Sequence, residues 1–230
     1  ARSPSANGVS AQPMSGATRI IAIRHGETAW NVDTRLQGHL DIGLNDRGLW
    51  QARRAGEALA DEDIAAVYSS DLSRASATAQ ALVDASNQDG ERPLRLHTGL
   101  RERGFGIFEG QTYAHIASTW PEESARWRRR EPHYAPQGGE SLVQLRERVS
   151  NTVNALASQH MGEQIVLVAH GGVMDALYRL ATRQDVESPR TWELGNAAIN
   201  RLLWTPDGLS LVGWSDTRHL EDVTLDETST

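Results

Sequence analysis

Cysteine and lysine are both missing from this chain of 230 residues. Without cysteine, the protein can form no disulfide, no thiolate zinc site and no cysteine nucleophile. Without lysine, it has neither a Schiff-base amine nor the lysine of a phosphate-binding P-loop. All 23 basic residues are therefore arginine. Any fixed positive charge in an active site must be a guanidinium group.

Long apolar runs and runs of positive charge are missing as well. No window approaches the roughly eighteen apolar residues that a membrane span needs, and we expect a soluble, cytoplasmic protein. The 23 basic and 30 acidic residues give a formal net charge of -7, and no stretch is basic enough to follow a nucleic-acid backbone. Neither a membrane nor a nucleic acid is therefore expected as a partner. The sequence leaves the oligomeric state open and is compatible with a homo-oligomer.

The composition of the two ends differs from that of the middle. Residues 1–18 are mainly Ser, Ala, Gly and Pro without an apolar run, which predicts a disordered tail. Residues 19–218 have the length of one sizeable α/β domain. Residues 219–230 are polar and are expected to form a second, shorter tail.

Three short apolar runs predict strands that are buried on both faces of a parallel sheet. They cover residues 19–24, 65–68 and 165–169. Each run ends in polar residues, and the first and third lead into a histidine followed by glycine. The same edge of the predicted sheet therefore carries most of the chemically useful side chains.

Helical patterns alternate with these runs, and a hairpin follows the last of them. An apolar face recurs from Leu142 to Leu156, and Ser141 with Gln144 supplies a capping box at its start. The other expected elements are helices over residues 45–60 and 71–83, the latter capped by Ser70 or Asp71, and an antiparallel edge hairpin with strands over 198–204 and 209–214. This order predicts an α/β fold with three α/β/α layers and a mostly parallel central sheet.

The two histidines after the predicted strands, His25 and His170, fall where open α/β sheets bind their ligands. The glycine after each allows a tight turn and a close approach of the backbone to a ligand. Arg24 precedes the first histidine, and Arg74 lies in the first turn of the helix expected over 71–83. Their forked donors suit a phosphoryl group, whose charge is spread over three oxygens. The pattern predicts a phosphate pocket.

Residues 24–28 (RHGET), with Asn31 beyond them, resemble the signature of the histidine phosphatase superfamily, which has the phosphoglycerate mutase-like fold. Later blocks that resemble this family follow in order at residues 36–38, 68–75, 100–102, 108–110, 138–141 and 168–171. The resemblance covers the chain from about Arg19 to Trp204. It implies a phosphoryl-transfer enzyme that needs no metal or other cofactor.

Carried over position by position, the resemblance implies that His25 is the residue that becomes phosphorylated. Glu102 would protonate the leaving oxygen and then act as the base for the attacking water, a role that spacing alone cannot assign. We expect Glu102 to lie away from the two arginines. The implied ligands of the phosphoryl oxygens are Arg24, Arg74 and His170, and the implied lining residues are Asn31, Gln37 and Gly171.

Three functions remain open for such a site. The first is a phosphatase that hydrolyses a small phosphorylated metabolite, the second a cofactor-dependent phosphoglycerate mutase, and the third a non-catalytic phospho-ligand-binding protein. The retained nucleophile argues against the third. The resemblance implies that mutases of this family have a long insertion in the segment after the acid and a lysine that holds the substrate carboxylate. Here the segment between Glu102 and residue 138 is short and lysine is missing, which argues against the second, although an arginine from 128–130 could hold a substrate carboxylate. We therefore expect hydrolysis to exceed mutase activity.

No metal site is expected from the other histidines, which show no paired metal-ligand spacing. We interpret them as surface or packing residues. They are His39, His97, His115, His133, His160 and His219.

Overall fold

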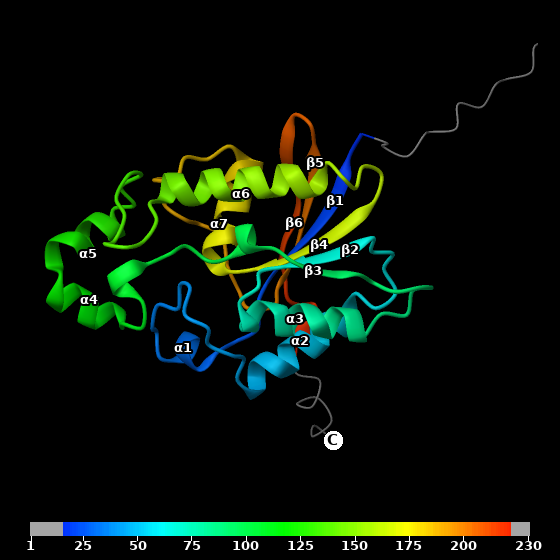
Figure 1. Cartoon of the computed structure of the whole chain (residues 1–230), viewed down its shortest axis with the longest axis horizontal. Coiled ribbons are helices and arrows are strands. Elements are labelled where there is room, and N and C mark those ends of the chain that lie inside the picture. The colour runs from blue at the N-terminus through cyan, green and yellow to red at the C-terminus, as the bar shows by residue number, and fades with distance from the viewer. Residues whose placement is uncertain (1–15, 222–230) are drawn as a thin grey trace, which may run out of the picture.

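Figure 1 shows a computed structural model of the chain, which describes residues 16–221. The tails expected at 1–18 and 219–230 fall mainly on residues 1–15 and 222–230, which lie outside the described residues. The folded part extends past both expected boundaries, because Thr18 begins the first strand and Arg218–Leu220 form a short 3-10 helix, η3. Within the described range, no helix has the length and hydrophobicity required to cross a bilayer.

A six-stranded sheet forms the centre of the domain. Its strands are β1 (Thr18–Arg24), β2 (Ala66–Ser69), β3 (Leu94–Leu96), β4 (Gln164–Ala169), β5 (Ile199–Thr205) and β6 (Gly208–Asp216). Across the sheet the order is β3-β2-β4-β1-β5-β6, with the first four parallel and β5 antiparallel to both of its neighbours. The predicted mostly parallel sheet and the edge hairpin are confirmed. Strand β3 has 3 residues, too few for a sequence pattern to reveal it.

Helices cover both faces of this sheet and give the three predicted layers (Figure 1). On one face lie α6 (Leu142–Ala157) and α7 (Gly171–Thr182), and on the other α2 (Asp46–Ala58) and α3 (Ser73–Asp84). Ile20 and Ala22 of β1 join the core beneath α6 and α7, whereas Ile21 and Ile23 join the core beneath α3. None of these four side chains is more than 1% exposed. Each fully buried isoleucine stabilises the fold by about 1.5–3 kcal/mol, which explains why β1 is apolar on both faces.

The capping of the helices follows the sequence in one case and not in another. The predicted capping box of Ser141 and Gln144 is present at the start of α6. Helix α3, in contrast, has Leu72 at its N-cap position without a side-chain cap, so the prediction of Ser70 or Asp71 is wrong. The amide of Ser73 instead donates to the carboxylate of Asp41 at 2.7 Å. A cap that comes from a separate loop leaves no local sequence signal.

Residues 103–137 form a covering segment next to the end of the sheet where β1 and β4 finish. It contains α4 (Tyr113–Thr119) and α5 (Pro121–Arg128), which stand apart from the sheet in Figure 1. Phe108 is fully buried there against Trp120 and Trp127, so the segment has a small core of its own. The two ends of the segment pack tightly against each other at Gly106. A Cβ at this residue would clash with a backbone carbonyl at the other end of the segment. The remaining short helices are α1 (Ala29–Val32), η1 (Thr98–Leu100) and η2 (Gly106–Phe108).

Candidate active site

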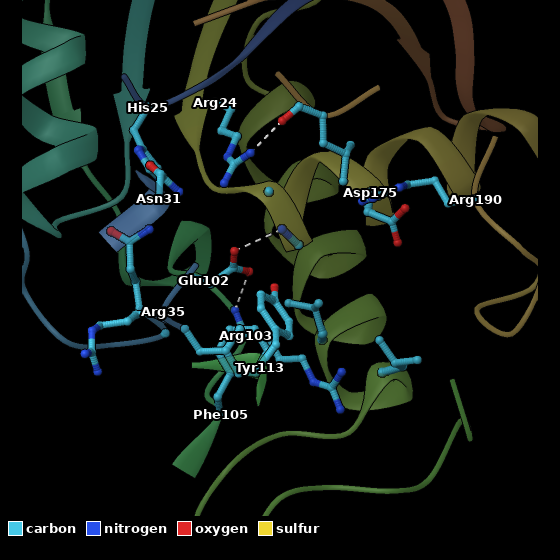
Figure 2. Close-up of a pocket in the computed structure, with 18 of the residues that line it drawn as sticks. Arg24, His25, Asn31, Arg35, Glu102, Arg103, Phe105, Tyr113, Asp175 and Arg190 are labelled. Atoms are coloured by element: carbon cyan, nitrogen blue, oxygen red, sulfur yellow. Dashed lines mark hydrogen bonds between the residues drawn. The ribbon is translucent and has the colours of Figure 1, made fainter. Parts of the chain in front are cut away.

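His25 and His170 lie side by side at the carboxyl ends of neighbouring strands. Strands β1 and β4 pair in parallel with Arg24 opposite Ala169, so the next residue of each strand reaches the same edge of the sheet. The two imidazole centroids are 5.2 Å apart. His25 borders a cavity of about 450 Å³, shown in Figure 2, whose walls come from the strand ends, from α7 and from the covering segment.

The ring of His25 is held in a single orientation by its own backbone. Its Nδ1 lies 2.6 Å from the carbonyl oxygen of Gly26, which can only accept, so Nδ1 carries the ring proton. Burial lowers the pKa of His25 well below its ordinary value, and the cations Arg24 and Arg74 lower it further. The imidazole is therefore neutral, and its Nε2 keeps a free lone pair, as a nucleophile requires.

His170 is held through its other nitrogen. Its Nε2 lies 2.8 Å from the hydroxyl of Ser70, and that hydroxyl oxygen accepts the amide of Leu72 at 3.3 Å. Burial, followed by the effect of His25, lowers the pKa of His170 well below its ordinary value, so this ring is neutral too. Since Ser70 receives one hydrogen bond, its own proton is available for Nε2 of His170. When the Ser70 hydroxyl donates to Nε2, the ring proton sits on Nδ1, which is buried and has no partner among residues 16–221.

Arg24 and Arg74 are fixed by backbone carbonyls rather than by carboxylates. Nη1 of Arg24 donates to the carbonyl of Leu194 at 2.6 Å. The two terminal nitrogens of Arg74 donate to Leu40 and Gly38, each at 2.7 Å. The Nε of each arginine is buried without a partner in the described part of the chain. The two guanidinium groups thus keep their charge and a free donor for an anion.

Glu102 lies beside the N-terminus of α7, below Arg24 in Figure 2. One carboxylate oxygen accepts the amide of Arg103 at 2.7 Å, and the other accepts the amide of Gly172 at 3.0 Å. Burial lowers the pKa of both Arg24 and Arg74, and the Glu102 carboxylate is close enough to oppose that shift in both. Its separation from the two arginines is therefore smaller than the sequence suggested.

The three predicted lining residues all border the cavity. Oε1 of Gln37 accepts the hydroxyl of Thr28 at 2.7 Å. Asn31 closes a capping box with Thr28 at the start of α1, so local helix geometry fixes its side chain. Gly171 is the first residue of α7, where the helix dipole favours an anion. A Cβ at this position would lie 3.4 Å from Arg24, a close but ordinary contact.

Sequence analysis missed several residues that border the cavity. Of the run 128–130, only Arg130 reaches it, while Arg129 pairs with Glu131. Gly172 and Arg103 also border it, and each follows a residue that the motifs had singled out. Ser70, which contacts His170, does not border the cavity. Arg190 lies in the aperiodic loop after α7, where no local signal marks it.

The six other histidines lie outside the cavity lining. His39 comes nearest to the site, since its Nε2 contacts the backbone carbonyl of Glu102 at 2.7 Å. Among residues 16–221, no three His, Asp or Glu side chains come together in an arrangement that could hold a metal ion.

Comparison with known proteins agrees with this fold. Residues 20–217 match the histidine phosphatase superfamily (branch 1). The chain is 37% identical over 206 residues to phosphoglycerate mutase-like protein 4 of Arabidopsis thaliana, covering 88% of this chain and 87% of that protein. It is 36% identical over 211 residues to the metal-independent phosphoserine phosphatase of the same plant, with coverage of 91% and 86%. The structure of Bacillus stearothermophilus YhfR superposes with a TM-score of 0.80 at 29% identity, covering 89% of this chain and 100% of that one.

A chain with a parallel-sheet site of this kind and these relatives is an enzyme of phosphoryl transfer. It belongs to the histidine phosphatase superfamily.

Proposed function

We propose that the protein hydrolyses small phosphate monoesters through a phosphohistidine on His25. The observation that supports this most directly is the unlike hydrogen bonding of two neutral histidines. His25 offers a lone pair on Nε2, and His170 offers a proton on Nδ1. A nucleophile therefore stands beside a neutral donor, and the two arginines that act on its pKa supply the positive charge that phosphoryl oxygens need.

The first half-reaction moves the phosphoryl group from the ester to the enzyme. Nε2 of His25 forms a bond to phosphorus while the bond from phosphorus to the leaving oxygen breaks. The step requires a proton on Glu102, which passes to the leaving oxygen as that bond breaks and leaves Glu102 as a carboxylate. The ring proton stays on Nδ1 of His25, where the Gly26 carbonyl stabilises the positive charge that develops on the phosphorylated imidazole.

The second half-reaction returns the enzyme to its starting state. The Glu102 carboxylate takes a proton from a water molecule as its oxygen attacks phosphorus, and the bond to Nε2 of His25 breaks. Inorganic phosphate leaves, and both Glu102 and His25 recover their initial protonation. Arg24, Arg74 and the Nδ1 proton of His170 stabilise the phosphoryl charge in both steps.

This proposal requires no metal ion, since guanidinium and imidazole groups take the role of charge stabiliser. A relative whose name describes a metal-independent phosphatase supports this expectation. We therefore expect full activity in excess chelator. Loss of activity with chelator, followed by recovery with a divalent ion, would contradict the metal-free mechanism.

The role of Glu102 is tested by comparing leaving groups. An alkyl phosphate needs a proton on its leaving oxygen, whereas p-nitrophenyl phosphate scarcely needs one. Glu102→Gln should therefore lower kcat about 10²–10⁴-fold for an alkyl phosphate and by less than about tenfold for the aryl phosphate. Equal losses on both substrates would remove Glu102 from the acid role.

Hydrolysis is separated from mutase activity by one product ratio. With 3-phosphoglycerate as substrate, we expect released phosphate to exceed the 2-phosphoglycerate formed, with or without added 2,3-bisphosphoglycerate. The short covering segment supports this expectation, because a shorter cover should admit water to the phosphohistidine more readily. Interconversion that is faster than hydrolysis and depends on the bisphosphate would identify a mutase.

A further inference from the structure

The loop that carries Glu102 has no regular secondary structure of its own. It comprises residues 101–105, between η1 and η2, and belongs to no helix or strand. The amides of Arg103 and Gly172 hold the Glu102 carboxylate, so its position depends on where this backbone lies. A loop without the hydrogen bonds of a helix or sheet needs partners from elsewhere in the chain to hold its polar groups in place. An ion pair next to the loop supplies those partners.

Arg148 of α6 binds the carbonyl groups of this loop. Its Nη1 donates to the carbonyl of Arg101 at 2.7 Å and to that of Gly99 at 3.0 Å, and its Nη2 donates to the carbonyl of Glu102 at 3.1 Å. The apolar face of α6 is buried in the core, so the helix gives this side chain a fixed base. One guanidinium group therefore ties the backbone at and before Glu102 to α6.

Glu140 orients this guanidinium group and binds the other side of the loop. Its two carboxylate oxygens accept Nε of Arg148 at 3.0 Å and Nη2 at 2.7 Å, which makes a forked ion pair. The oxygen that meets Nη2 also accepts the amide of Gly104 at 2.8 Å. Burial raises the pKa of Glu140, but the hydrogen bonds from Arg148 and Gly104 outweigh it and lower that pKa below its ordinary value. The carboxylate is therefore charged at neutral pH.

The ion pair lies next to Glu102 but outside the cavity. Neither Arg148 nor Glu140 borders the cavity, so we expect neither to touch a bound substrate. Every backbone group of the loop that they bind lies within three residues of Glu102. Proton transfer needs the carboxylate within hydrogen-bond distance of the leaving oxygen, and a misplacement of about 1 Å can lower the rate about 10²-fold. The position of this backbone therefore affects the rate as well as the stability of the fold.

We propose that Arg148 and Glu140 are positioning residues for Glu102, which hold the backbone on both sides of it so that its carboxylate stays within reach of the leaving oxygen. This inference rests on the proposed function, because it takes Glu102 as the proton donor. The ion pair acts most on substrates whose leaving oxygen needs a proton. It therefore affects kcat for alkyl phosphates more than kcat for aryl phosphates, and it leaves KM nearly unchanged.

The test breaks the ion pair and compares two leaving groups. Arg148→Gln should lower kcat about tenfold to a hundredfold for an alkyl phosphate and less than about threefold for p-nitrophenyl phosphate, with each KM within about twofold of the wild type. Arg148→Lys should restore little of this loss, because a single ammonium group cannot reproduce the fork. Glu140→Gln keeps an oxygen for the Gly104 amide and should show the same pattern to a smaller extent. It carries the test if Arg148→Gln does not fold.

Arg201→Gln is the matched control. Arg201 forms a forked ion pair with Glu62 at 2.9 and 3.0 Å, and neither residue borders the cavity. This variant should leave the ratio of alkyl to aryl turnover unchanged. Equal losses on both esters in Arg148→Gln, or a wild-type ratio in both Arg148→Gln and Glu140→Gln, would overturn the positioning role.

Hydrogen exchange of the Arg103 amide separates this inference from the proposed function. If Glu102→Gln shows no dependence on the leaving group, the acid role fails, and turnover no longer reports on the ion pair. The Arg103 amide still does, since it donates to the Glu102 carboxylate. Its exchange should be at least about tenfold faster in Arg148→Gln, while the amides of β4 exchange at the wild-type rate. An unchanged rate at Arg103 would contradict the positioning role even in an inactive enzyme.

Discussion

The imidazole rings of His25 and His170 lie 5.2 Å apart, yet each is held through a different ring nitrogen. His25 is fixed through Nδ1 by a carbonyl that only accepts, and His170 through Nε2 by a hydroxyl that can donate. Both rings are buried and neutral, so this choice of partner decides which nitrogen carries the proton. One ring becomes a lone-pair donor and the other a proton donor.

Ser70 should therefore influence catalysis without touching the substrate. In Ser70→Ala, the Nδ1 proton of His170 is no longer favoured, and we expect kcat to fall by roughly tenfold to a hundredfold, less than for deleting a transition-state donor outright. The ¹⁵N chemical shifts of the His170 ring should show protonation moving from Nδ1 towards Nε2.

Ser69→Ala is the matched control for this variant. Ser69 is a fully buried neighbour whose hydroxyl bonds only to the backbone. It should cost about 1 kcal/mol of stability and leave the His170 shifts unchanged. A Ser70→Ala enzyme with wild-type kcat and wild-type ring shifts would contradict the proposed proton position.

Gly172 should be required for the position of Glu102 rather than for the fold. A Cβ at residue 172 would lie 2.2 Å from Oε1 of Glu102. Gly172→Ala should therefore displace the carboxylate and reproduce the leaving-group dependence of Glu102→Gln. Alanine favours a helix over glycine by about 1 kcal/mol, which offsets part of the cost of the clash. The melting temperature should therefore change much less than the turnover does.

Gly213 provides the control for this substitution, since a Cβ there meets no atom within 4 Å. Gly213→Ala should leave turnover of both alkyl and aryl phosphates unchanged. If Gly172→Ala retains wild-type kcat on alkyl phosphates, Glu102 is not held where the mechanism needs it.

The two neutral histidines should also make the fold sensitive to mild acid. In the unfolded chain a histidine has a pKa of about 6.5, whereas burial lowers the pKa of His25 and of His170 well below that value. Between the folded pKa and pH 6.5 the unfolded state binds more protons. The free energy of unfolding therefore falls as the pH drops below about 6.5, by up to about 1.4 kcal/mol per pH unit for each histidine.

Urea unfolding between pH 7 and pH 5 measures this slope. In His170→Gln the free energy of unfolding should depend less steeply on pH than in the wild type. Substitution of the exposed His133 by Gln serves as the control and should retain the wild-type slope. An unchanged slope in His170→Gln would show that His170 is not buried as a neutral ring.

The parts of the site that could be predicted lie where a backbone rule fixes their position. Parallel pairing of β1 with β4 brings the residues after both strands to one edge, and this rule is sufficient to place His25 and His170 together. The first turn of α3 places Arg74 in the same way. The assignment of Glu102 as a candidate acid came from family resemblance alone.

The remaining features depend on contacts between segments that are far apart in the sequence. Asp41 caps α3 across 32 positions. Ser70, which the sequence pattern indicates as a local cap, bonds instead to His170 across 100 positions. Arg190 reaches the cavity from an aperiodic loop. No local propensity or spacing encodes such contacts, so they appear only once the chain has folded.

The most direct test of the mechanism is to trap the phosphorylated enzyme. The wild-type protein should be mixed with an excess of p-nitrophenyl phosphate, quenched in alkali within milliseconds, and digested for mass spectrometry. The mechanism predicts one added phosphoryl group on the peptide that contains His25, stable in alkali and lost in acid, and absent from His25→Ala, which should not turn over. An acid-stable adduct on a serine or threonine, or near-normal turnover by His25→Ala, would contradict it.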